Sequence, residues 1–370
     1  MMRTRWITGA AAFLIVPFVL QGCGFGNNEG SEDMDEPPEE VTEEIEWGEL
    51  EGETEEGEET ETEAELEEGS SEESSNDSAE TETVERELYL LDEEGMVVPQ
   101  TFELPKEEGV LNQSLEYLVS DGPLTSMLPN GFRAVLPAGT EVDVNLKEGT
   151  AITDFSTEFR DYDPKHEQAI LQAVTWTLTQ FENVDDVSLR INGYEQETMP
   201  VNNTPIGESY SRENGINLEN GQVSDMTGSD SVTIYFLSQN QEDAYYVPVT
   251  RRVEGQEDGN MLEAAMDELA KGPAADSSLY DVFREGTSLA NEVTMEGETA
   301  SLLFNEGLLT EQEGTAIAEE ALHAIALSAT EVEGVQEVEL NVEGVEDVVK
   351  VTGESIEPLA RPALVNADIS

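Results

Sequence analysis

The sequence predicts an α+β protein in which two tandem domains of β-α-β-β-α-β type follow a signal peptide and a disordered acidic tether. The main observation is an internal repeat, because the landmarks of one half return in the same order about 150 residues later. Two further observations concern the N-terminal part of the chain. A short apolar segment ends at a cysteine and predicts the signal peptide, and a strongly acidic stretch after it predicts the tether. In each domain, we expect helices packed on one face of a small sheet.

The repeated landmarks are an apolar strand, a Val-Pro pair, a Gly-Pro pair, a Gly-Thr pair and an aromatic residue that ends a strand. They are Leu88-Tyr89-Leu90 and Ile234-Tyr235-Phe236, Val98-Pro99 and Val247-Pro248, Gly122-Pro123 and Gly272-Pro273, Gly139-Thr140 and Gly286-Thr287, and Asp154-Phe155 and Leu303-Phe304. Features that both copies share belong to the scaffold, whereas features of one copy are candidates for special chemistry. The apolar, glycine and proline positions recur, but the polar residues show no repeated constellation.

The N-terminus has the form of a signal peptide. Arg3 and Arg5 precede an apolar run from Ile7 to Leu20, which is short for a membrane span. The run closes on Leu20-Gln21-Gly22-Cys23, which resembles the lipobox of bacterial lipoproteins. This resemblance implies that Cys23 is lipid-modified through its sulfur and becomes the mature N-terminus, on the outer face of a membrane. The alternative is a leftover cysteine without a role. Cys23 is the single cysteine, so the chain forms no intrachain disulfide.

The chain is extremely acidic. It has 84 Asp and Glu residues against 16 Lys and Arg residues, for a net charge of −68. Nearly half of the residues from Glu29 to Glu87 are acidic, and Arg86 is the single basic residue among them. This density of like charge predicts a disordered, extended tether, although a specific partner for the tract is an alternative. Nucleic acid is excluded as a partner, because phosphate binding needs the basic residues that are scarce here.

Each copy opens on the apolar strand, which leads through the Val-Pro pair toward a first helix. Apolar residues at helical spacing predict this helix over 111–118 in the first copy and over 262–269 in the second. Gly122 and Gly272 follow these helices, where we expect them to adopt the left-handed conformation that ends a helix. The proline after each glycine prevents continuation.

A hairpin, a second helix and a last strand complete each copy. Alternating apolar residues predict the hairpin over 142–155 and again over 293–304. The second helix starts at Asp163-Pro164 in the first copy, while Thr310 with Glu313 forms an expected capping box in the second. The expected buried positions are Ile170, Val174, Leu178, Phe181, Val187, Leu189 and Ile191, and Ile317, Ala321, Ile325, Val338, Leu340 and Val342; residues 348–351 are a candidate for one more strand.

These elements divide the chain into six segments. The expected boundaries are 1–22 for the signal peptide, 23–85 for the tether, 86–198 for the first domain, 199–231 for a linker, 232–354 for the second domain and 355–370 for a C-terminal tail. The linker is expected because its residues are rich in Asn, Gly, Ser and Glu and poor in apolar side chains.

The sequence offers few candidates for chemistry. His166 and His323 are the only histidines and occupy non-equivalent positions, so we expect a solvated side chain for the first and a structural role for the second. Asp161-Tyr162-Asp163 could touch a cation but lacks the further ligands and central glycine of an EF-hand loop. Trp47 is either a docking spot in the tether or a stray aromatic residue, and Trp176 borders the core of its domain. We therefore predict no catalytic, cofactor-binding or metal-binding residue.

In their order, the Val-Pro opening, the helix ending in Gly-Pro, the Gly-Thr turn and Asp154-Phe155-Ser156 resemble the GerMN-domain lipoprotein family. The resemblance covers roughly 86–353, and the second copy departs from it at Leu303-Phe304-Asn305. It implies a sporulation and germination lipoprotein, similar in fold to the ring-building modules of secretion-type channels. It also implies envelope and sporulation channel proteins as partners, while homo- and hetero-oligomers both remain open.

The function that follows is a membrane-anchored, non-catalytic assembly component of an envelope complex. The alternatives are a cell-wall-acting envelope enzyme or enzyme accessory, and an acidic lipoprotein that buffers metal ions.

Overall fold

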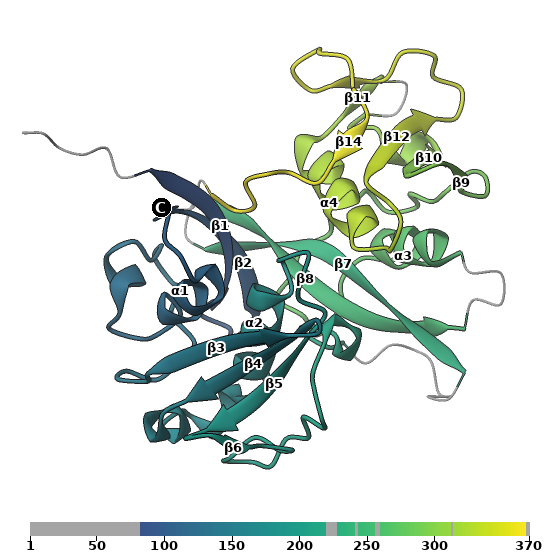
Figure 1. The fold of residues 1–370 in the computed structure, drawn as a ribbon. Coiled ribbons are helices and arrows are strands. Elements are labelled where there is room, and N and C mark those ends of the chain that lie inside the picture. The colour runs from purple at the N-terminus through teal and green to yellow at the C-terminus, as the bar shows by residue number, and fades with distance from the viewer. Residues whose placement is uncertain (1–81, 220–227, 241–242, 256–259, 312–313, 368–370) are drawn as a thin grey trace, which may run out of the picture. The chain divides into compact units, whose positions relative to one another are not determined.

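The computed structural model describes residues 82–219, 228–240, 243–255, 260–311 and 314–367. The expected signal peptide, nearly all of the expected tether, Cys23 and Trp47 lie outside these residues. Within the described ranges, no helix combines the length and the apolar character that a membrane span requires. The structure has two tandem α+β copies, as the repeat predicts (Figure 1).

The first copy consists of a long hairpin, two helices, three short 3₁₀ turns and a separate four-stranded sheet. Its elements are β1 (Thr83–Leu91), β2 (Val97–Pro105), α1 (Val110–Glu116), η1 (Pro123–Ser126), β3 (Val142–Lys147), β4 (Thr150–Phe155), η2 (Thr157–Arg160), η3 (Pro164–His166), α2 (Glu167–Leu178), β5 (Asp186–Ile191) and β6 (Tyr194–Glu195). The sheet has the order β3-β4-β5-β6, and β4 and β5 run parallel. Because α2 connects these two strands, it is a crossover helix.

The second copy repeats this plan and adds three short strands. Its elements are β7 (Ser229–Asn240), β8 (Asp243–Glu254), α3 (Met261–Ala270), β9 (Thr294–Glu296), β10 (Thr299–Phe304), η5 (Glu306–Leu308), β11 (Ala316–Ile317), α4 (Glu319–Thr330), β12 (Glu337–Val342), β13 (Val349–Lys350) and β14 (Leu359–Ala360). The sheet order is β14-β12-β10-β9, with β10 and β12 parallel around α4.

The opening strand of each copy is in fact a two-stranded hairpin, so each copy reads β-β-α-β-β-α-β and contains two main sheets. We call the β1–β2 pair hairpin 1 and the β7–β8 pair hairpin 2. The turn at 93–95 and the extended residues after it can be read from the sequence, but our prediction counts them with the opening strand rather than as a strand of their own. Both strands of hairpin 1 are buried on both faces near the turn and show no alternation.

The two hairpins have the same register around the repeated landmarks. Tyr89 pairs with Pro99 in hairpin 1, and Tyr235 pairs with Pro248 in hairpin 2. The N–H of Tyr89 points away from its partner strand and donates to the hydroxyl of Thr177 in α2, at 3.1 Å. The N–H of Tyr235 donates to Ser328 in α4, at 2.9 Å. The proline opposite each tyrosine therefore needs no N–H for the ladder, which explains why this landmark tolerates proline.

The repeated Gly-Pro pairs have different conformations in the two copies. Gly272 has φ 74°, as expected, but Gly122 is extended and Asp121 is the left-handed residue, with φ 60°. The expectation for Gly122 was wrong because α1 already ends at Glu116, short of the predicted Leu118. Glycine is required at position 122 for space instead, since an added Cβ would lie 2.7 Å from the carbonyl oxygen of Val119.

The predicted start of the fourth helix was also wrong. Thr310 is not an N-cap, because α4 begins at Glu319 and the Thr310 hydroxyl donates to the carbonyl oxygen of Ala316. Ile317, expected on the helix stripe, lies in β11 and pairs with Lys350 in β13. The candidate strand over 348–351 is confirmed as β13, and its long-range pairing holds residues 316–317 extended.

The expected linker and tail contain equivalent structured segments. Tyr210 forms an antiparallel bridge with Val187 of β5, and Leu359 pairs in the same way with Val338 of β12. We call residues 210–219 arm 1 and residues 359–367 arm 2. Each arm leaves the four-stranded sheet of its own copy and continues toward the hairpins.

Glu167 fixes the start of the expected linker to α2. Its carboxylate is buried and accepts hydrogen bonds from the N–H groups of Val201, Asn202 and Thr204 and from the hydroxyls of Tyr162 and Thr204. Burial opposes ionisation, but these donors outweigh it and lower the pKa of Glu167 to about 2.

Replacing Glu167 with Gln should lower the free energy of unfolding at pH 7 by about 2 kcal/mol, because the buried N–H groups lose an ionised acceptor. The stabilisation is complete above the ordinary pKa of 4.5 and is lost as the pH falls toward 2. Urea unfolding of both proteins between pH 7 and pH 3 measures the difference, which should shrink on acidification. The exposed Glu182→Gln is the matched control, and an equal effect there would refute the assignment.

Candidate functional site

The two copies meet where β2 of hairpin 1 lies beside β8 of hairpin 2. Asn217 of arm 1 bridges these strands with its side-chain amide. Its Oδ1 accepts from the N–H of Val97 at 2.8 Å, and its Nδ2 donates to the carbonyl oxygens of Val97 at 2.7 Å and Pro248 at 2.8 Å. A single side chain thus satisfies backbone groups of both copies.

Asn366 of arm 2 makes the equivalent contacts with the copies exchanged. Its Oδ1 accepts from the N–H of Tyr246 at 2.8 Å, and its Nδ2 donates to the carbonyl oxygens of Tyr246 at 2.9 Å and Pro99 at 2.7 Å. Val97 and Tyr246 precede the two Val-Pro pairs and are equivalent positions of the repeat. Asn217 and Asn366 also share the left-handed conformation, with φ 44° and 56°.

The residue before each asparagine pairs with the hairpin of the other copy. Val365 donates its N–H to the Thr101 hydroxyl at 2.9 Å and accepts from the Thr101 N–H at 3.0 Å. Ile216 makes the same two contacts with Thr250, both at 2.9 Å. The contact is therefore reciprocal, like the self-complementary interface of a two-fold dimer. Each arm crosses to the hairpin of the other copy.

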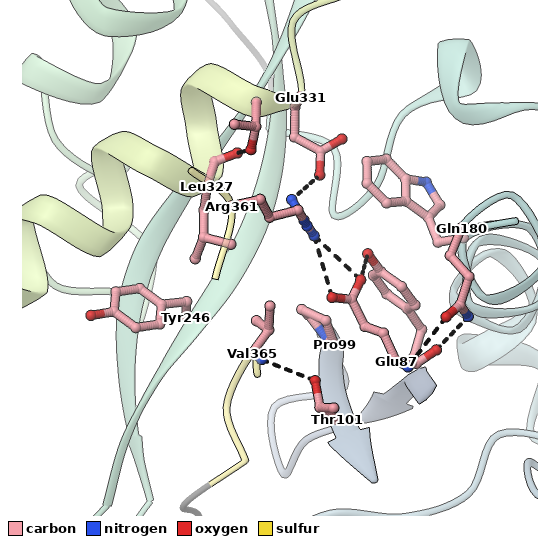
Figure 2. Close-up of polar contacts among 12 residues, drawn as sticks. Glu87, Pro99, Thr101, Gln180, Tyr246, Leu327, Glu331, Arg361 and Val365 are labelled. Carbon is pink, nitrogen blue, oxygen red and sulfur yellow. Dashed lines mark hydrogen bonds and ion pairs between the residues drawn. The ribbon is translucent and has the colours of Figure 1, made fainter. Parts of the chain in front are cut away.

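Figure 2 shows a charged cluster beside arm 2, where Arg361 lies between two carboxylates from different copies. Its guanidinium donates to Glu331 at 2.9 Å and to Glu87 at 3.3 Å. Arg212 of arm 1 reaches the same Glu331 at 2.9 Å and lies 4.2 Å from the ring centre of Trp176. Four residues separate the arginine from the bridging asparagine in each arm.

Burial alone would raise the pKa of Glu331, but the Arg212 and Arg361 guanidinium groups keep it below its usual value. The same carboxylates hold the pKa of both arginines above the ordinary value. Glu331 therefore carries its negative charge beside two positively charged arginines at neutral pH. Two arginines share Glu331, so removing that carboxylate would leave the half-buried Arg212 without its ion-pair partner and Arg361 with Glu87 alone.

A further ion pair attaches arm 1 to hairpin 2. Arg251 of β8 is 6% exposed and donates to the Glu219 carboxylate at 2.6 Å. Its guanidinium also lies 3.5 Å from Glu268 of α3 and 4.9 Å from the ring centre of Phe236. The arm is therefore held at its beginning, middle and end by charged or amide side chains.

One polar contact of the interface, between Asp92 and Tyr245, occurs once and is not repeated at the equivalent positions. Asp92, in the turn of hairpin 1, is 2% exposed, and its Oδ2 accepts from the Tyr245 hydroxyl of β8 at 3.1 Å. Phe132 packs on the same tyrosine, with the ring centres 5.1 Å apart. Burial raises the pKa of Asp92 to about 6, against the opposing effect of the Met96 N–H. The repeat places Ser238 and Met96 at the equivalent positions, so this contact has no counterpart.

The histidine and aromatic candidates lie in separate surroundings and do not form a common site. His166 is partly exposed, and its Nε2 lies 3.0 Å from the guanidinium of Arg133 in an exposed contact. His323 packs edge-on against Tyr246. Trp176, which was expected to border the core, is 1% exposed and lies under Arg212.

Asp161-Tyr162-Asp163 serves local structure in the described fold. Tyr162 donates to Glu167, and Asp163 accepts from the N–H of Lys165 at the start of η3. Among the described residues, no three His, Cys, Asp or Glu side chains are grouped so that they could hold a metal ion. The lipidation candidate Cys23 lies outside the described residues and stays a prediction.

Two pairs of polar residues repeat, which was not expected from the sequence. Arg212 and Arg361, and Asn217 and Asn366, recur at the spacing of the scaffold, so the statement that polar residues form no repeated constellation was wrong. The available signal was the pattern Arg-x-x-x-Ile/Val-Asn. It occurs once in the expected linker and once in the expected tail, at equivalent places of the repeat.

Comparison with known proteins places the two copies in a family. The family model described as "Germane: Sporulation and spore germination" matches residues 87–197 and 233–348. The spore germination protein GerM of Bacillus subtilis is 43% identical over 361 residues, which cover 96% of each chain. The solved tandem GerMN domains of that protein superpose with a TM-score of 0.72 at 47% identity, over 77% of this chain and 99% of theirs. Lipoprotein LpqB of Thermobifida fusca is 29% identical over 150 residues, 39% of this chain and 23% of its own length.

We expect Asn217→Ala and Asn366→Ala each to lower the free energy of unfolding by about 2 kcal/mol, because each leaves buried backbone groups without partners. Asn203→Ala is the matched control, since Asn203 is exposed and also left-handed, with φ 59°. The Asn203→Ala variant therefore measures only the cost of placing alanine in the left-handed backbone conformation. Urea unfolding compares the three variants, and equal losses would show that the amide bridges contribute nothing.

Asp92 should make the interface less stable as the pH rises. The pKa of Asp92 in the folded protein is about 6 and lies above the ordinary value of 3.8. The protonated Asp92 side chain therefore stabilises the fold fully below pH 3.8, and this stabilisation is lost as the pH rises through 6. Asp92→Asn should therefore be more stable than the wild type at pH 7.5, by up to about 3 kcal/mol, and should lose this advantage near pH 4. Urea unfolding at both pH values measures the difference, and a constant one would contradict the assignment.

Proposed function

The chain belongs to the Germane family of sporulation and spore germination proteins, and from this membership we propose that it is a non-catalytic assembly component of an envelope complex, anchored to a membrane by a lipid on Cys23. The observation that carries the proposal is the reciprocal interface. Its buried amide bridges and ion pairs tie two small α+β copies together through backbone and side chains that carry no reaction chemistry.

The copies retain surfaces on which partners could dock. In the second copy, β12 alternates between buried and exposed positions, and Glu337, Glu339 and Asn341 face outward. In the first copy, β3 is an edge strand of its sheet with the exposed residues Asp143, Asn145 and Lys147. Polar sheet surfaces of this kind suit the wet, reversible interfaces of assembling complexes.

The lipid anchor is supported by the match of Leu20, Gly22 and Cys23 to the lipobox pattern. A relative named as a lipoprotein, LpqB, is consistent with it. The acidic residues of 23–85 would then separate the folded copies from the membrane surface, because like charges keep such a chain extended. This arrangement places the two copies on the extracytoplasmic side, where envelope partners are available.

The alternative is a cell-wall-acting envelope enzyme or enzyme accessory. Its support is the abundance of carboxylates, since glycoside hydrolysis uses a pair of them. In the described part of the chain, the buried Glu167 and the partly buried Glu219 and Glu331 are occupied by structural hydrogen bonds and ion pairs. The scaffold function is therefore favoured.

We expect Cys23→Ala to move the protein from the membrane fraction to the soluble fraction of cells that express it, because the acyl chains have no other attachment point. Sporulation efficiency should fall toward that of the deletion strain. Gly26→Ala, which lies outside the four lipobox residues, is the control. Unchanged membrane retention would refute the anchor, and peptidoglycan hydrolysis abolished by one Asp or Glu substitution would refute the non-catalytic function.

A further inference from the structure

Arm 2 occupies a groove whose walls come from both copies. On the side of hairpin 1, Thr101 is 7% exposed and pairs with Val365, while Gln100 is 2% exposed and its Nε2 donates to the carbonyl oxygen of Asn366. On the other side, Val365 packs against the buried side chains of Tyr235 and Leu327 (Figure 2). The groove therefore offers backbone pairing, a buried amide donor and an apolar pocket.

An acidic pocket extends the groove toward the start of the arm. Glu87 and Glu331 both contact the guanidinium of Arg361, and the Tyr235 hydroxyl lies 3.3 Å from it. A side chain here must be long, cationic and able to serve several acceptors, which matches arginine. Recognition of the arm thus rests on three side chains, those of Arg361, Val365 and Asn366.

Arm 1 makes the equivalent main-chain and asparagine contacts with a different sequence, and its arginine also reaches Glu331. Ile216 pairs with Thr250, Asn217 bridges the hairpins, and Arg212 reaches Glu331. The two arms read Arg-Glu-Asn-Gly-Ile-Asn and Arg-Pro-Ala-Leu-Val-Asn from Arg212 and Arg361. They share the arginine, the β-branched residue and the asparagine, and these are the side chains that the grooves contact. The three residues between them differ completely.

We propose that the groove at Thr101 is a peptide-binding site for an extended segment of the pattern Arg-x-x-x-Val/Ile-Asn, and that arm 2 of a second copy of this chain can occupy it. Recognition combines main-chain pairing with side-chain pockets, as in strand-addition complexes. Arm exchange would join two chains through the contacts that each chain now makes internally. This inference goes beyond the proposed function, because it holds whichever envelope proteins the chain binds.

The test uses the full chain with its own arm weakened by Arg361→Ala and Asn366→Ala. A fluorescent peptide of residues 357–367 should bind this variant, and its fluorescence anisotropy should rise in a saturable way. The wild-type chain should bind the peptide at least tenfold more weakly, because its tethered arm competes at a high effective concentration. A peptide with Asn366→Ala should also bind about tenfold more weakly, because it loses the amide contacts.

A pair of groove variants distinguishes specific binding from adhesion. In the arm-weakened chain, Thr101→Val should reduce peptide binding about tenfold, because it removes the hydroxyl that accepts from Val365. Thr101→Ser keeps the hydroxyl and should retain binding. Peptide binding that Thr101→Val leaves unchanged would overturn the proposal.

Circular dichroism of the arm-weakened chain establishes that it is folded. If the double variant does not fold, the single Asn366→Ala chain replaces it, since Arg361 and Val365 still hold its arm, and its affinity should be intermediate. Absence of peptide binding by the folded chain would overturn the proposal. These results are independent of Cys23 and of sporulation, so the proposed function can fail while this inference stands, and the reverse.

Discussion

The structure depends on the way in which two asparagine side chains satisfy the facing edges of two β-hairpins. An unpaired strand edge exposes N–H and C=O groups that must find hydrogen-bond partners. The facing strands β2 and β8 do not supply these partners to each other. Asn217 and Asn366 supply them, each with one acceptor and two donated hydrogen bonds. Because each asparagine sits on an arm that leaves its own copy, the same contacts that close the edges also join the copies. The position of the arms, the burial of Val365 and Ile216 and the charged cluster all follow from these bridges.

The chain places scarce basic residues at this interface. The whole chain has 84 acidic and 16 basic residues, and acidic residues outnumber basic ones in both folded copies as well. Like charge therefore opposes the contact between the copies at neutral pH, and that repulsion must be offset where they touch. Arg212, Arg251 and Arg361 do this by contacting Glu331, Glu219 and Glu87 in surroundings that exclude most water. Buried ion pairs add little net stability compared with apolar packing, but they penalise every arrangement that leaves one member unpaired. The cluster therefore serves mainly to select one arrangement of the copies.

Much of the scaffold could be predicted from the sequence, because apolar periodicity and turn glycines are local signals. The hairpin over 142–155 formed as expected, and Gly139 and Gly286 have positive φ in both copies. Predictions failed where a distant partner decides the conformation. Residues 316–317 follow a helical pattern but pair with β13, and hairpin 1 is buried on both faces by elements from both copies. The arms were hidden for the same reason: their polar composition is that of a linker, and only the hairpins of the other copy explain why Asn217 and Asn366 recur.

The surface through which the copies meet is nearly self-complementary. The differences between the copies determine that a first copy pairs with a second copy. Two first copies, or two second copies, would each bring two arginines and two glutamates to the cluster, so charge balance alone does not separate these pairings. Position 92 does, because a pair of first copies would place buried Asp92 opposite Met96 and remove the Tyr245 hydroxyl that it now contacts. A second difference lies at Gln180 of the first copy and Glu331 of the second copy. Gln180 binds the backbone of Glu87, whereas Glu331 binds both arginines. A buried polar group without its partner costs more than a well-matched one contributes, so these few unshared residues fix which copy faces which. The duplicated unit thus keeps its scaffold twice and places its distinguishing residues at the contact between the copies.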